Sequence, residues 1–322
     1  MANLTSLKSD ISSHLTFVCP SCRKPLSLAG RSALCNSCMR VFAVSEHGYW
    51  DLTSRLESGT LTELPPTPDD YVEDQHCNGE RLFEAFLKPL IGAIQPTEAL
   101  DVGCGAGEMV RQFQKSGIRC YGIDLASNAK HWAMAEADTC SFFGADARQL
   151  PFADNSFDFV MSLGVIEHIG TVTGHCTLSK TYVEDRLRYA EEIVRVTKPN
   201  GSIVIAAPNK SFPIDIQHGP TDEVSSKAPL RSFVSRKTGL NVHKTWGDYH
   251  LPSYSEVRRL FLDHAGAKSW EALPLKGYFG FGRFRRGFLR PFSLLAEAYV
   301  DHLPKPFLRT CLNPYVLVRI TK

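Results

Sequence analysis

The strongest constraint on the fold is a glycine-rich turn between an apolar strand and a helix-like segment. It lies in EALDVGCGAGEMVRQFQ, residues 98–114, and contains Gly103, Gly105 and Gly107. Glycines at such a turn let the backbone approach a ligand where a Cβ would clash. The spacing lacks the third glycine of a dinucleotide-binding loop, and no Lys-Ser/Thr pair follows, which excludes a phosphate-binding P-loop. Taken alone, the turn does not establish a ligand-binding site, which needs support from the segments that follow it.

Further strand candidates follow this turn and alternate with helices. RCYGID ends at Asp124, CSFFGAD ends at Asp146, SFDFVMSLG comes next, and SIVIAAP follows the helix RYAEEIVRVTK. This alternation predicts a doubly wound parallel sheet, whose ligands bind outside the carboxyl ends of the strands. An Asp at a strand end is more often a turn residue. Asp124 and Asp146 are in register with Gly103, however, and Asp124 is well placed to accept both hydroxyls of a ribose.

Four segments carry a more specific resemblance. LDVGCGAG, YGIDLA, GADARQLPFADNSFDFVMS and EEIVRVTKPNGSIVIAAPN together resemble class I S-adenosylmethionine-dependent methyltransferases of the type 11 kind, over roughly residues 80–210. The resemblance implies an α/β fold with a doubly wound, seven-stranded Rossmann-like sheet. It also implies an enzyme that uses S-adenosyl-L-methionine as its methyl donor. The Gly103–Gly107 loop would pass under the methionine part, with Asp101 near its ammonium group.

The same resemblance implies the remaining cofactor contacts. Asp124 would hold the ribose hydroxyls, while Asp146 and the backbone of Ala147 would face the amino edge of the adenine. Leu163, just past the fourth strand, would border the sulfonium. Cys104, inside the glycine turn, is interpreted as a small space-filling residue rather than a nucleophile.

The chemistry needs little beyond alignment, because the sulfonium is already activated. A hydroxyl acceptor also needs a base, and His168 in SLGVIEHI, with Glu167 before it, is the candidate. Similar Glu-His pairs help to bind a metal in ubiquinone-pathway O-methyltransferases, but the further acid used there is Gly164 here. Two interpretations stay open, a general base or a histidine that only packs near the cofactor. His218 and His250 are expected to be solvated loop residues.

Four cysteines near the N-terminus form a separate motif. CPSC and CNSC, separated by twelve residues, contain Cys19, Cys22, Cys35 and Cys38. Each C-x-x-C turn directs two thiolates at one point, and two such turns supply the ligands of a tetrahedral structural Zn²⁺ site. A redox pair and a disulfide framework suit the context less well, and an iron–sulfur cluster stays open. The spacing predicts a zinc ribbon.

These patterns divide the chain into three parts: a zinc-ribbon module at 1–52, a Pro-rich linker at 53–70 and a methyltransferase domain at 71–322. Two segments of the domain stand out. An insertion at about 208–250 is expected to cover the acceptor, and a basic, aromatic segment occupies 276–292. A helix carrying Leu260 and Phe261 on its apolar face should precede the sixth strand, and PYVLVRI is expected as an antiparallel last strand.

Composition excludes several classes of protein. With 322 residues of which 43% are apolar, the chain has ample material for a core, so wholesale disorder is excluded. A net charge of +2 gives no global attraction to nucleic acid. No stretch approaches the roughly 18 to 20 apolar residues of a membrane span, and the N-terminus lacks the apolar core of a signal peptide. We therefore expect a soluble, cytoplasmic protein.

The predicted function is methyl transfer from S-adenosylmethionine to a small-molecule or lipid-linked acceptor, by O- or N-methylation. The alternative is a ribosomal RNA methyltransferase, because bacterial large-subunit guanine methyltransferases join an N-terminal zinc module to the same catalytic fold. A third hypothesis, a non-catalytic binder, fits poorly with an intact glycine loop. The 276–292 segment is compatible with peripheral membrane contact or RNA binding, and the zinc ribbon with a protein partner.

Overall fold

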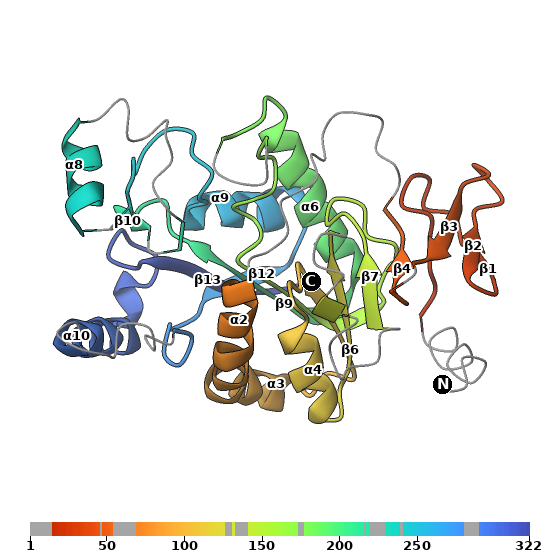
Figure 1. Cartoon of the computed structure of the whole chain (residues 1–322), viewed down its shortest axis with the longest axis horizontal. Helices are drawn as coiled ribbons and strands as arrows, with labels where there is room; N and C mark the ends of the chain where they lie inside the picture. The colour runs from red at the N-terminus through yellow and green to blue at the C-terminus, as the bar shows by residue number, and fades with distance from the viewer. Residues whose placement is uncertain are drawn as a thin grey trace.

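The computed structural model describes residues 15–45, 47–53, 69–125, 131–132, 141–172, 177–215, 217–218, 229–238, 241–279 and 290–322. A twisted sheet runs through the middle of the molecule, with helices packed on both of its faces (Figure 1). Residues 54–68 of the predicted linker lie outside the described part of the chain. Within the described part, no helix has the length and apolar character needed to span a bilayer.

The centre of the sheet has the predicted parallel arrangement. The strands are β5 (Glu98–Val102), β6 (Arg119–Asp124), β7 (Phe142–Gly144), β8 (Phe157–Leu163) and β9 (Thr197–Pro208). They pair in the order β7-β6-β5-β8-β9, and every pair is parallel. The direction of winding changes between β5 and β8, which is the point where open α/β sheets bind their ligands.

The far edge of the sheet is antiparallel, as predicted for the last strand. β13 (Tyr315–Thr321) pairs antiparallel with β9, and β12 (Ser269–Ala272) pairs antiparallel with β13. β12, the next strand of this sheet after β9 in chain order, therefore lies at the outer edge, and the C-terminal strand β13 is inserted between β12 and β9.

Helices cover both faces and bury alternate side chains of each strand. One face carries α2 (Asp69–Leu82), η1 (Phe83–Leu87), α3 (Lys88–Ile94) and α4 (Glu108–Lys115); the other carries α6 (Tyr182–Val196), α9 (Tyr254–Arg258) and η4 (Arg259–His264). Leu100 belongs to the core under α6, whereas its neighbour Ala99 belongs to the core under α4. Leu260 and Phe261 are buried, which confirms the predicted apolar face of that helix.

The sheet has eleven strands, because four strands of the N-terminal module extend the seven strands that the large domain contributes. The module contributes β1 (Ser27–Ala29), β2 (Ser32–Leu34), β3 (Val41–Val44) and β4 (Trp50–Asp51). β4 pairs parallel with β7, at Trp50–Phe143 and Asp51–Gly144. The edge of β7 would otherwise expose unpaired backbone groups, and β4 supplies their partners.

The module also shares its hydrophobic core with the large domain. The ring of Phe17 lies 5.4 Å from that of Phe143 and 5.9 Å from that of Phe152. Backbone hydrogen bonds join the two parts, among them one from Val18 N to Pro151 O at 3.0 Å. The module is therefore packed against the sheet as one body with it.

Smaller elements complete the described chain. They are β10 (Ile214–Asp215), α8 (Pro229–Thr238), β11 (Asn241–Val242), α10 (Arg290–Asp301) and η7 (Lys305–Phe307). Within the predicted basic, aromatic segment, residues 280–289 lie outside the described part. Of its described aromatics, Tyr278 packs against Phe86 at 5.4 Å and Phe279 against Tyr315 at 5.0 Å between ring centroids. These two side chains face the core rather than a partner.

Candidate functional site

The glycine turn sits at the carboxyl end of β5 and leads into α4. Gly103, Gly105 and Gly107 have φ values of +82°, +54° and +84°, a region that L-residues with a Cβ rarely adopt. Close packing reinforces this requirement, because a Cβ on Gly103 would lie 2.3 Å from the side chain of Val165. The loop is thus folded tightly between β5 and the segment after β8.

Asp124 fixes this turn from the end of β6. Its Oδ2 accepts a hydrogen bond from Gly105 N at 2.7 Å, and its Oδ1 accepts one from Leu125 N at 2.6 Å. The residue predicted to bind the ribose therefore lies at the switch point, beside the glycine loop. Whether it holds a ribose stays a prediction.

Asp101 lies deeper, with 4% of its surface exposed. Burial, together with the negative charge of Asp124, raises the pKa of its carboxyl group to about 8. The buried carboxyl group of Asp101 beside the carboxylate of Asp124 forms a site in which a cationic group is favoured. The neighbouring thiol of Cys104 is buried, and burial raises its pKa, so it is an inert packing residue as interpreted from the sequence.

Asp146 follows β7 and is engaged in an ion-pair network. Its Oδ2 lies 2.7 Å from Nη2 of Arg148, and Nη1 of the same arginine lies 2.8 Å from Oδ1 of Asp185 on α6. Asp146 Oδ1 also accepts a hydrogen bond from Arg148 N. The network holds the Asp146–Ala147 segment in place at the sheet edge. The adenine contact of Asp146 and Ala147 stays a prediction. No local pattern in the sequence indicates the role of Arg148, which depends on Asp185 of α6.

Two further residues at the loop were also missed. The Oε1 atom of Gln75, on α2, accepts a hydrogen bond from Ala106 N at 3.0 Å. The indole of Trp132 is fully buried and donates from Nε1 to Gly105 O at 2.8 Å. Gln75 occupies a polar position of an amphipathic helix, and no local pattern distinguishes it from a solvated glutamine.

The predicted catalytic pair follows β8 directly. Leu163 ends that strand, Gly164 has a φ of +76°, and His168 N donates to Val165 O at 2.8 Å to close the turn. Glu167 is fully buried, and burial raises the pKa of its carboxyl group to about 7. The pair thus lies beside the glycine loop, which Val165 contacts.

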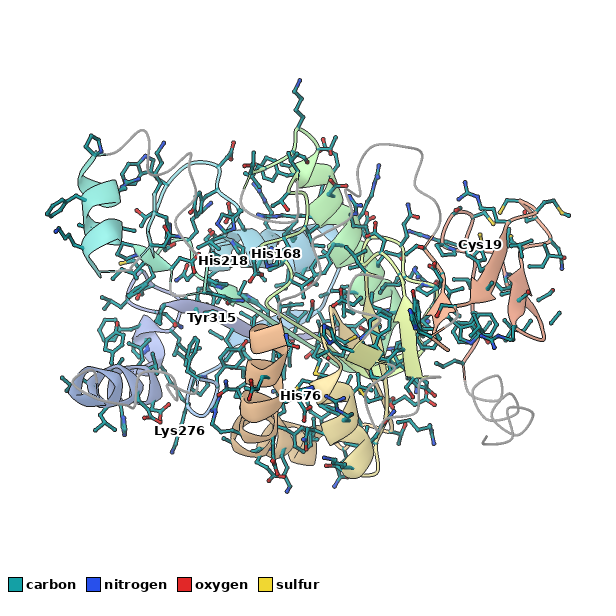
Figure 2. The ribbon with its side chains drawn as sticks, in the orientation of Figure 1. Cys19, His76, His168, His218, Lys276 and Tyr315 are labelled. Carbon is teal, nitrogen blue, oxygen red and sulfur yellow. The ribbon has the colours of Figure 1, made fainter. Side chains whose placement is uncertain are left out.

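His218 and His250 are not solvated, contrary to the expectation from sequence. His250 is 0% exposed, and the ring centroids of His218 and His250 lie 5.1 Å apart. His218 shares a hydrogen bond of 2.8 Å between its Nδ1 and Oδ2 of Asp215, and its Nε2 lies 3.4 Å from Nε2 of His168. Figure 2 shows His168 and His218 next to each other. The insertion therefore delivers two histidines to the site.

Opposing effects set the charge of these imidazoles. Burial lowers the pKa of His218, but the hydrogen bond and the charge of Asp215 outweigh it, so the net direction is upward. Burial and the nearby His218 lower the pKa of His250 to about 3, so this ring is neutral. The site therefore combines one imidazole that favours protonation with one that stays neutral.

The four N-terminal cysteines converge as predicted. Their Sγ atoms all lie within 4.8 Å of one another, with distances of 3.6 Å for Cys19–Cys38 and 3.4 Å for Cys22–Cys35. Zn–S bonds of about 2.3 Å in a tetrahedron place sulfurs roughly 3.8 Å apart. The thiols are free rather than paired as disulfides. The residues therefore fit a Cys₄ zinc centre, and Cys19 is labelled in Figure 2.

Residues 100–205 match the family described as a methyltransferase domain. Norajmaline N-methyltransferase from Rauvolfia serpentina is 32% identical over 118 residues, which cover 34% of this chain and 36% of that enzyme. Ubiquinone biosynthesis O-methyltransferase from Rhodopseudomonas palustris is 27% identical over 168 residues, which cover 51% and 58%. The chain thus spans less than two thirds of these relatives. The matches support an S-adenosylmethionine-dependent methyltransferase.

Two solved structures of S-adenosylmethionine-dependent methyltransferases align with much of this chain. The structure of an S-adenosylmethionine-dependent methyltransferase from Archaeoglobus fulgidus is 16% identical, with a TM-score of 0.44 over 80% of this chain and 100% of that chain. The corresponding enzyme from Mesorhizobium loti is 14% identical, with a TM-score of 0.41 over 73% and 96%.

Proposed function

We propose that the protein transfers the methyl group of S-adenosylmethionine to an oxygen or nitrogen of a small-molecule acceptor. The observation that carries this proposal is the pairing of Asp101 and Asp124 around the glycine turn at the switch point of the sheet. S-adenosylmethionine carries a sulfonium and an ammonium group, and two mutually destabilising carboxylates favour such a cation.

The cofactor would lie along the carboxyl ends of β5, β6 and β7. Asp101 would face the ammonium group, and the hydroxyls of the ribose would bond to Asp124, which Gly105 N already orients. The adenine would lie near Asp146 and Ala147, held in place by the Arg148 network. Leu163 at the end of β8 would border the sulfonium. Holding donor and acceptor in line contributes about 7–11 kcal/mol to catalysis.

The acceptor would bind on the side of β8, where the insertion at about 208–250 reaches the sheet edge. Glu167 and His168 are the groups proposed to activate it, because they lie next to the glycine loop and contact the insertion through His218. Relatives of this chain include enzymes named tocopherol O-methyltransferase and malonyl-[acyl-carrier protein] O-methyltransferase, which supports an acceptor that is not RNA.

We further propose that a structural Zn²⁺ is bound by Cys19, Cys22, Cys35 and Cys38. Zinc would join the two C-x-x-C turns, and Cys19 and Cys35 are themselves part of the core shared with the sheet. The ion would supply folding stability rather than chemistry. Its site lies in the module that pairs with β7, and Figure 2 shows Cys19 far from His168.

The test is an extract-labelling assay. The protein receives methyl-labelled S-adenosylmethionine and extract separated into RNA, protein, lipid and small-molecule fractions. The proposal expects label in small molecules, and much less of it with Asp124→Asn when S-adenosylmethionine is limiting; Asp263→Asn, on the exposed end of η4, is the matched control and should retain activity. Label confined to RNA would establish the ribosomal alternative, and label in the lipid fraction would identify a lipid-linked acceptor.

A further inference from the structure

Five titratable side chains converge beside the candidate site, and none of them is among the residues proposed to bind the cofactor. Glu167 and His168 come from the segment after β8, Asp215 and His218 from the β10 region, and His250 from the segment before α9. Ligand atoms of Glu167, His168 and His218 all lie within 4.8 Å of one another, and the same holds for Asp215, His218 and His250. Segments distant in sequence thus build one cluster.

The imidazoles of His168 and His218 are separated by the distance expected of two ligands of one metal ion. Nε2 of His168 lies 3.4 Å from Nε2 of His218, outside the usual 2.7–3.2 Å range of an N–H hydrogen bond. Metal–nitrogen bonds of about 2.0–2.1 Å in a tetrahedron place two nitrogens roughly 3.4 Å apart. The opposite ring nitrogen of His218, Nδ1, bonds to Asp215, which is the arrangement that orients a metal-binding histidine.

Buried polar atoms in the cluster point to a missing partner. Neither Oε1 nor Oε2 of Glu167 has a hydrogen-bond partner among the described residues, and neither has Nδ1 or Nε2 of His250. Both side chains are 0% exposed. A buried carboxyl group without a partner is costly, and an ion beside Glu167 would satisfy it.

We propose that Glu167, His168 and His218 bind a divalent transition-metal ion, with Asp215 orienting His218 and His250 lying beside the site. Two imidazoles and one carboxylate favour an ion such as Zn²⁺, Co²⁺ or Fe²⁺ over Mg²⁺, which prefers oxygen ligands. The ligand set does not use position 164, which is glycine. His218 comes from the insertion, so the site forms only when the insertion packs on the sheet.

The role of this ion rests on the proposed function. Val165, two residues before Glu167, packs against Gly103 of the cofactor loop, so the cluster faces the acceptor side of the same crevice. A divalent ion there would lower the pKa of an acceptor hydroxyl that reaches it. His168 would then act on the acceptor as a metal ligand rather than as a direct base.

Metal analysis of the full-length protein tests the proposal. After incubation with Zn²⁺ and removal of unbound ion, the protein should hold two equivalents, one at the cysteines and one at the new site. His218→Ala and Glu167→Gln should each hold one equivalent. The control His264→Ala, at an exposed histidine that pairs with Glu191 on the surface, should hold two. Loaded with Co²⁺, the second equivalent should show visible absorption without thiolate charge transfer.

One equivalent in the wild type, or a second that survives in His218→Ala, overturns the proposal. If His218→Ala does not fold, Asp215→Ala serves instead, because loss of an orienting partner lowers metal affinity by about 10–100-fold. Unchanged affinity in Asp215→Ala contradicts the geometry. Binding of S-adenosylmethionine, measured separately by calorimetry, distinguishes failure of this site from failure of the proposed function.

Discussion

Gly107→Ala gives the sharpest test of how the cofactor loop is built. Gly107 is the N-cap residue of α4 and has a φ of +84°, and a Cβ there would lie 2.5 Å from the ring of Phe142. Phe142 is fully buried and stacks on Trp132 at 5.5 Å between centroids, with an interplanar angle of 9°. The ring therefore has little room to move, and the added methyl group must displace packed core.

The magnitude follows from two separable effects. A residue with a Cβ in the left-handed region costs about 1–2 kcal/mol, and an overpacked core costs about 1–3 kcal/mol. Gly117, at the other end of α4, provides the matched control: its φ is +79°, and a Cβ there meets nothing within 4 Å. Gly117→Ala should therefore cost only the conformational part, about 1–2 kcal/mol, whereas Gly107→Ala should cost about 2–5 kcal/mol.

Guanidinium unfolding of both variants measures the difference. In a Phe142→Leu background, Gly107→Ala should lose part of its excess cost, because the smaller side chain leaves room for the methyl group. Equal free energies of unfolding for Gly107→Ala and Gly117→Ala would refute the packing argument. They would mean that the loop relaxes away from Phe142.

Two further predictions concern the metal and the buried acid. Cys35→Ser should lower bound zinc by one equivalent, measured by mass spectrometry, while Cys311→Ser, at an exposed cysteine outside the cluster, should not; equal zinc in both contradicts the Cys₄ assignment. Asp101 has a folded-state pKa of about 8, raised by burial and by the charge of Asp124, against an ordinary value near 4. Between these values the folded state binds more protons than the unfolded state, so stability falls as pH rises from about 4 to 8. Asp101→Asn should reduce the dependence of the free energy of unfolding on pH over this range, measured by unfolding titrations. An unchanged pH dependence would contradict the raised pKa of Asp101.

The local patterns of the sequence were enough to predict the parallel sheet, the glycine turn and the cysteine cluster. Each depends on short-range rules: strand-helix alternation, glycine at positive φ, and C-x-x-C turns that aim two sulfurs at one point. The position of Asp124 follows for the same reason, because carboxyl ends of parallel strands share one edge. Gly105 N and Asp124 Oδ2 are nineteen residues apart and still meet.

Long-range packing explains what the sequence did not reveal. The pairing of β4 with β7 joins segments about ninety residues apart, and no periodic pattern encodes it. His218 and His250 look like loop histidines in isolation, yet the insertion folds back and buries them against His168. Arg148 likewise acquires its role only when α6 brings Asp185 beside it.

The most direct test of the central claim is calorimetric titration of the protein with S-adenosylmethionine. The wild type and Asp263→Asn should bind one equivalent with the same affinity. Asp124→Asn should bind roughly ten- to a hundred-fold more weakly, because loss of hydrogen bonds to a charged group costs about 1.5–3 kcal/mol. No binding by the wild type, or equal affinity in Asp124→Asn, would contradict the claim that the glycine turn and Asp124 form the cofactor site.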